Sequence, residues 1–244
     1  HQDIVSARLQ TLANLPHTKQ ALLIVPLPTL MHRLAPIDFI TSRTFSYRVG
    51  EDLDRDKLKD QLSKAGYKRV DTVYEHGEYA FRGSLIDIYP MGAKQPFRID
   101  LLDDEIESLR LFDAESQRTS ENVTQIQLLP AREFPLDKQA TNLFLNNWHD
   151  NFDQDASKCP VYRDINDGIA PQGIEYYLSL FFDQTANLFD YMPANTQLFS
   201  HVGIEEAAQT FWQDVKARYT EYGVDPTRPI LPPKQLFLAV DEVF

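Results

Sequence analysis

The sequence predicts an α/β fold in which a layered scaffold is interrupted by a smaller β-rich domain. Short continuous apolar runs are typical of strands buried on both faces, as in a parallel sheet. Three such runs lie in the flanks of the chain, at Ala21–Val25, Gln197–Phe199 and Leu236–Val240. Amphipathic helices are expected at about 137–150 and 204–220, and strands that alternate with helices favour an α/β layer architecture.

The middle of the chain has a different pattern from its flanks. A strand at about 45–49 precedes a helix that Asp54 would cap and Gly66 would end. Closely spaced strands then follow at about 70–75, 78–82, 84–89, 97–102 and 105–112. We therefore predict three segments: a first scaffold segment at 1–43, an inserted β-rich domain at 44–129 and a second scaffold segment at 130–244.

The composition excludes several classes of protein. The chain has 244 residues, a formal net charge of −12 and a single cysteine, Cys159. So acidic a chain gains little from counterion release on DNA, and nucleic acid is not expected as its main ligand. A lone cysteine rules out an internal disulfide and a cysteine zinc cage, and it fits a reducing cytoplasm. No apolar run approaches the roughly 18 residues of a membrane span, and the missing initial Met indicates a fragment.

Catalytic and metal-binding patterns are weak. The sequence contains no phosphate loop of the form GxxxxGK[ST], no GxGxxG after a strand, no HExxH and no GxSxG. Its six histidines are scattered without metal-ligand spacing. Carboxylates near one turn are the best candidates for acid–base chemistry: Asp100, Asp103, Asp104, Glu105 and Glu107. Water solvates such a turn, so we interpret them as part of a surface.

Strand alternation indicates which surface this is. Within 97–102, Arg98 and Leu102 point to one side and the apolar residues between them to the other. If the aromatic side of the strand at 78–82 packs on the preceding helix, Arg82 emerges beside them. Asp104 and Glu105 follow at the adjoining turn. Two arginines, an exposed leucine and acidic neighbours fit a protein interface, and they also fit a solvated sheet face with cross-strand ion pairs.

Several stretches resemble a known family. They are "HGEYAFRGSLIDIYPMG", "FRIDLLDDEIESLRLFDAESQRT", "LLPAREFP", "GIEYYLSLFF" and "GVDPTRPILPP". In this order they closely resemble the bacterial transcription-repair coupling factors (Mfd), over essentially the whole chain. A weaker likeness, through RGxxIDIxP and RIDxxxDEI, extends to the excision-repair protein UvrB. The "GIEYYL" and "GVDPTRP" stretches favour the coupling factors.

The resemblance implies a fold and a function. The flanks would form a parallel-sheet scaffold like that of a helicase motor, and 44–129 would bind the repair protein UvrA. This part would be non-catalytic and without a cofactor. The full protein would be an ATP- and Mg-dependent DNA translocase that displaces stalled RNA polymerase, and a C-terminal domain would mask the UvrA-binding face. Two alternatives stay open: a UvrB-type ATP-dependent repair enzyme, and weak DNA contacts of the scaffold.

The family's UvrA-contacting residues carry over onto five positions. Arg82 lies in "FRG", Arg98 in "FRID" and Asp104 in the "DDEI" turn, with Glu105 beside it. Leu102 occupies a place where family members often carry Phe, and it would keep the apolar contact with less area. Because guanidinium groups bind carboxylates well and lose little hydration on burial, we expect Arg82→Ala or Arg98→Ala to weaken UvrA binding and to leave the fold intact.

Overall fold

The computed structural model describes residues 2–244, which fall into two units. The first comprises the described residues up to Asn14 together with Asp38–Pro135. The second comprises Leu15–Ile37 together with Leu136–Phe244. Neither unit contains, among residues 2–244, a helix with the length and apolar character needed to cross a membrane. The chain is an α/β protein with a mixed sheet.

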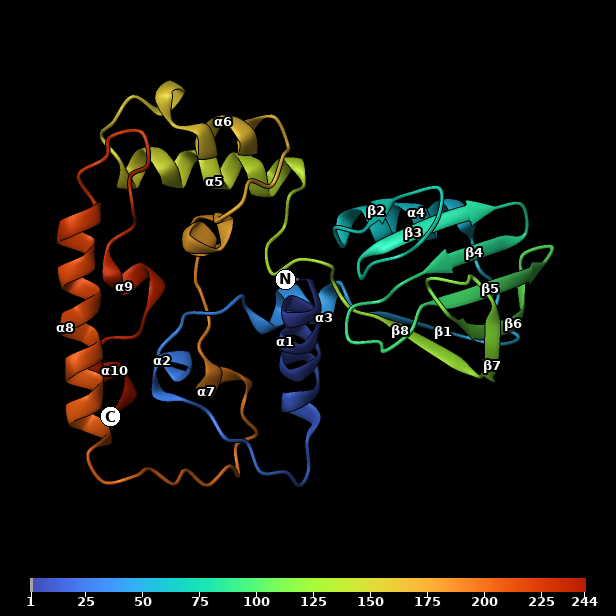
Figure 1. Ribbon diagram of the computed structural model, residues 1–244, viewed down its shortest axis with the longest axis horizontal. Coiled ribbons are helices and arrows are strands. Elements are labelled where there is room, and N and C mark those ends of the chain that lie inside the picture. The colour runs from blue at the N-terminus through green and yellow to red at the C-terminus, as the bar shows by residue number, and fades with distance from the viewer. Residues whose placement is uncertain (1) are drawn as a thin grey trace. The chain divides into compact units, whose positions relative to one another are not determined.

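The first unit is built on a six-stranded sheet in the order β2-β3-β4-β5-β6-β7 (Figure 1). Its strands are β2 (Lys68–Arg69), β3 (Glu78–Arg82), β4 (Leu85–Ile88), β5 (Phe97–Leu102), β6 (Glu105–Phe112) and β7 (Thr119–Val123). Only the β2–β3 pair is parallel. A separate antiparallel pair joins β1 (Phe45–Arg48) to β8 (Gln125–Leu128). The strands predicted at 45–49, 78–82, 84–89, 97–102 and 105–112 are confirmed.

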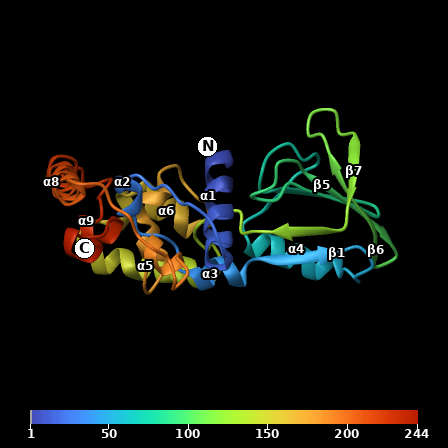
Figure 2. The same ribbon diagram turned by 90° about the horizontal axis from the view of Figure 1, so that it is seen from below.

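Helix α4 (Arg55–Lys64) forms as its sequence predicts. The Asp54 side chain accepts hydrogen bonds from the first-turn backbone N–H groups, and Gly66 has the positive φ of 86° that suits glycine after a helix. The helix covers one face of the six-stranded sheet (Figures 1 and 2), where the Arg55 and Lys59 cations lie over the Phe81 ring. Glu78, Ala80 and Arg82 therefore point to the opposite face.

Two further helices complete the first unit, and one strand predicted there from the sequence is wrong. Helix α1 (Gln2–Asn14) begins this unit, and α3 (Ile37–Ser42) precedes β1. The predicted strand at 70–75 is wrong, because the chain there turns and only Lys68–Arg69 joins the sheet. The structure adds β7 and β8, which sequence analysis did not propose.

The second unit is helical and packs around Trp148. Its longer helices are α5 (Lys138–Asn151) and α8 (Ile204–Tyr222), as predicted. The shorter ones are η1 (Leu15–His17), α2 (Leu27–Leu30), η2 (Ala156–Lys158), α6 (Pro160–Asn166), η3 (Ile174–Phe181), α7 (Leu188–Tyr191), α9 (Pro233–Leu236) and α10 (Val240–Val243). The Trp148 ring stacks on Tyr177, with centroids 5.5 Å apart. Burial raises the pKa of Tyr177 to about 12, and its hydroxyl donates to the Pro229 carbonyl.

The parallel-sheet scaffold predicted for the flanks is not confirmed. Residues 21–25, 197–199 and 236–240 do not form strands; the last range lies partly in α9 and α10. Within the described part of the second unit, β pairing is limited to isolated bridges such as His32↔Phe237. Residues 151–172, whose sequence resembles a long loop, contain η2 and α6. An apolar run becomes a strand only when another strand satisfies its backbone, and no ladder does so here.

Candidate functional site

Asp87 is the centre of the candidate site. It lies in β4 between Ile86 and Ile88, and alternation turns these two side chains into the core while Asp87 points to the face opposite α4. Its side chain is 0% exposed. An ionised carboxylate so deeply buried is stable only with hydrogen-bonded cationic partners.

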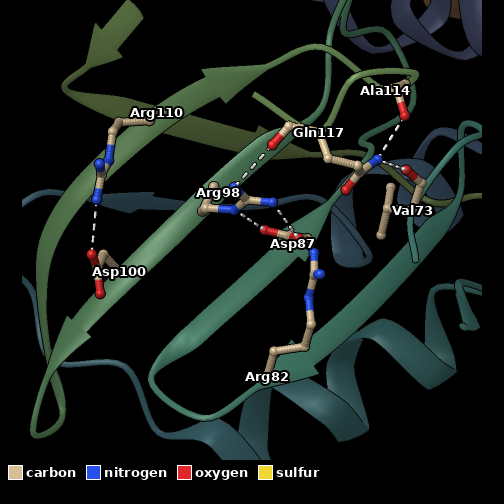
Figure 3. A network of polar contacts seen from close by, with 8 residues as sticks. All are labelled: Val73, Arg82, Asp87, Arg98, Asp100, Arg110, Ala114 and Gln117. Atoms are coloured by element: carbon tan, nitrogen blue, oxygen red, sulfur yellow. Dashed lines mark hydrogen bonds and ion pairs between the residues drawn. The ribbon is translucent and has the colours of Figure 1, made fainter. Parts of the chain in front are cut away.

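Two arginines from neighbouring strands supply those partners (Figure 3). Arg98, directly across from Asp87 in β5, donates from Nε to Oδ1 at 2.7 Å and from Nη2 to Oδ2 at 2.9 Å. Arg82, at the end of β3, donates from Nη2 to the same Oδ2. We call Arg82, Asp87 and Arg98 the arginine cluster. Two positive charges against one negative charge leave this cluster with a net positive charge.

The Arg98 guanidinium has contacts beyond Asp87. Its Nη1 donates to the Gln117 carbonyl at 3.3 Å, and its guanidinium carbon lies 4.7 Å from the centroid of the Phe112 ring. The hydrogen bonds to Asp87 raise the pKa of Arg98 above its usual value. The side chain is only 15% exposed, compared with 42% for Arg82. Arg98 thus has the surroundings of a structural residue, and Arg82 has an open side.

A second ion pair separates like charges on the same face. Arg98 and Arg110 are directly opposite each other in the β5–β6 ladder, an arrangement that destabilises a sheet when the charges are unpaired. Each has its own carboxylate: Arg98 binds Asp87, and Arg110 donates from Nη2 to Asp100 at 2.8 Å. Figure 3 shows the two pairs near each other, with Arg98 and Asp100 both on β5.

The remaining predicted residues form the β5–β6 hairpin tip, which we define as Leu102–Glu105. Leu102 pairs with Glu105 at the end of the ladder, and Asp103 takes a positive φ of 55° at the turn, so a tight turn joins the strands predicted at 97–102 and 105–112. The Asp104 carbonyl accepts from the Leu53 N–H at 2.7 Å. Leu102 itself is 64% exposed. The tip is therefore anchored through its backbone while its side chains face solvent.

The structure brings some of the predicted residues together and leaves others apart. Arg82 and Arg98 share one carboxylate, and the alternation that put Arg98 and Leu102 on one side of β5 is confirmed by the burial pattern. No contact links the side chains of Asp104 or Glu105 to the arginine cluster among the described residues. Of the acidic residues considered for catalysis, Asp100 binds Arg110, and the other four lie in exposed positions.

Sequence analysis missed Asp87, and this omission changes one expectation. Arg98→Ala cannot be assumed to leave the fold intact, because it would remove both strong bonds to a buried carboxylate and leave only Arg82. Arg82→Ala is the milder change, since Asp87 would keep Arg98. Arg110 and Gln117 were also not proposed as members of this network.

Comparison with known proteins assigns the chain. Residues 45–134, which contain β1 through β8, match the model of the UvrB interaction domain. The whole chain aligns with the transcription-repair-coupling factor of Escherichia coli K12 at 49% identity and with that of Haemophilus influenzae at 42%. The chain belongs to the transcription-repair-coupling factor family. The Bacillus subtilis member is 29% identical over 80% of the chain.

The match covers a small part of the length of these relatives. The chain spans about a fifth (21%) of the length of the Escherichia coli and Haemophilus influenzae coupling factors. The stretch that matches the UvrB interaction domain includes the arginine cluster and the whole hairpin tip. All five positions proposed for partner binding therefore lie inside the one segment that a family model recognises.

Proposed function

We propose that this chain is a non-catalytic recruitment module that binds UvrA in transcription-coupled repair. The observation that carries the proposal is the combination, within the UvrB interaction domain match, of an open arginine and an exposed leucine. Interfaces use such an arrangement, in which a guanidinium binds an acidic group and an apolar side chain fills a pocket.

We also propose a setting for the module, which rests on similarity to proteins named transcription-repair-coupling factor. The complete protein would be an ATP- and Mg-dependent DNA translocase in the cytoplasm that displaces stalled RNA polymerase. Its contacts with polymerase and DNA would lie outside the present chain. A C-terminal domain would cover the UvrA-binding face at rest, so the present chain alone would bind UvrA constitutively.

Co-elution with UvrA tests the proposal. The 244-residue chain and purified UvrA, mixed at micromolar concentration, are expected to leave a sizing column as a complex. The informative variant is Leu102→Asp, which puts a charge where an apolar contact is expected and should weaken the complex by about tenfold or more, as loss of an interface hot spot does.

A matched control is available in the second unit. Leu198 is 65% exposed, almost the same as the 64% of Leu102, so Leu198→Asp adds the same charge at an equally open position. It should leave binding unchanged. Absence of a complex with the wild-type chain, or equal losses in the two variants, would contradict the proposed function.

A further inference from the structure

The two arginines of the cluster use their donors unequally. Arg98 has all three guanidinium nitrogens engaged: Nε and Nη2 with Asp87, and Nη1 with the Gln117 carbonyl. Within residues 2–244 the Arg82 side chain makes one hydrogen bond, from Nη2 to Asp87. Its Nε and Nη1 have no partner among the described residues, and its side chain is the more exposed of the two. Arg82 is therefore the arginine with capacity for a further ligand.

A series of hydrogen bonds leads from Gln117 to Arg82 (Figure 3). Gln117 is tied down by its side-chain Nε2, which donates to the carbonyls of Val73 at 3.0 Å and Ala114 at 2.6 Å. The Gln117 carbonyl holds Arg98, Arg98 holds both oxygens of Asp87, and Asp87 Oδ2 holds Arg82. Each step is a hydrogen bond to a residue that is itself immobilised.

We infer that Asp87 and Arg98 are positioning residues and that Arg82 is the arginine that contacts an acidic side chain of UvrA. This inference rests on the proposed function. An unrestrained arginine loses side-chain freedom on binding, and a group already fixed in its bound direction avoids most of that loss. Removing Asp87 should therefore weaken binding although it makes the face more positive.

The sign of the change in UvrA affinity distinguishes a positioning role of Asp87 from a purely electrostatic role of the arginines. Asp87→Asn keeps the shape of the side chain and removes one negative charge. If the arginines acted only through their charge, the more positive face would attract an acidic partner faster and bind it more tightly. If Asp87 fixes Arg82, the variant should bind UvrA about fivefold more weakly, mainly through faster dissociation, as is usual for interface substitutions.

A double-mutant cycle with Arg82→Ala is the deciding experiment. Association and dissociation rates of UvrA are measured for the 244-residue chain, for Asp87→Asn and Arg82→Ala, and for the double variant, each corrected for its folded fraction. Asp87→Asn should cost about fivefold in the wild-type background and less than about twofold beside Arg82→Ala, because coupled residues are not additive. Should Asp87→Asn fail to fold, Arg98→Lys, which keeps a cation beside Asp87, takes its place in the same cycle.

The outcomes distinguish this inference from the proposed function. Equal losses in the two backgrounds, or tighter binding by Asp87→Asn, would overturn the inference while UvrA binding by the wild-type chain stands. A wild-type chain that does not bind UvrA would overturn both. A purely structural Asp87 would lower the folded fraction and leave the dissociation rate of the folded molecules unchanged, which also counts against the inference.

Discussion

The two units enclose different kinds of buried side chain. In the first unit, Asp87 is a buried carboxylate that two arginines hold on the face of the sheet opposite α4. In the second unit, Trp148 is 0% exposed and packs against Tyr177, Phe152, Tyr162 and Phe144. A buried ion pair adds little net stability but has strict geometry, whereas aromatic packing contributes mainly stability. The arginine cluster thus fixes the orientation of its groups, whereas the aromatic cluster around Trp148 mainly stabilises its unit.

The largest expected effect is on the aromatic centre. Trp148→Ala should lower the free energy of unfolding by about 3–5 kcal/mol, the usual cost of removing a large buried aromatic side chain. Thermal and urea unfolding measure this change. Trp212, half-buried on α8, provides the control: Trp212→Ala should cost clearly less. Equal losses for the two tryptophans would show that Trp148 is not the centre of its unit.

A smaller effect is expected in the arginine cluster, and it should be unequal. Arg98→Ala removes two bonds to a buried carboxylate and should cost about 2–3 kcal/mol, typical of hydrogen bonds to charged groups. Arg82→Ala breaks one partly exposed contact and should cost less than about 1 kcal/mol. Urea unfolding of the two variants measures the difference. Similar costs would contradict the division between a structural and a partner-facing arginine.

The two units also differ in how far their folds could be predicted from the sequence. Between Phe97 and Phe112 the strands alternate and are joined by a tight turn, so each strand has its partner a few residues away. The apolar runs at 21–25 and 197–199 have no such local partner, and hydrophobicity alone cannot say whether one exists elsewhere. Helices such as α4 were predictable because Asp54 and Gly66 mark their ends in the sequence.

Sequence analysis found the residues on the surface of the candidate site but missed Asp87 at its centre. Alternation placed Arg98 and Leu102 on one side of β5. The same reasoning applied to Leu85–Ile88 would have placed Asp87 on that side too, so the signal for it was present. The contact of Arg98 with the Gln117 carbonyl could not be foreseen, because it depends on a loop in which Gln117 adopts a positive φ of 59°.

Hydrogen exchange of the chain with and without UvrA tests the central claim most directly, because it finds the interface without any substitution. We expect UvrA to slow exchange at the hairpin tip, Leu102–Glu105, and at the neighbouring β3–β4 turn around Gly83. Exchange at 197–202, in the second unit, should not change. Slowing at 197–202 with the hairpin tip unaffected would contradict the assignment of the UvrA-binding face.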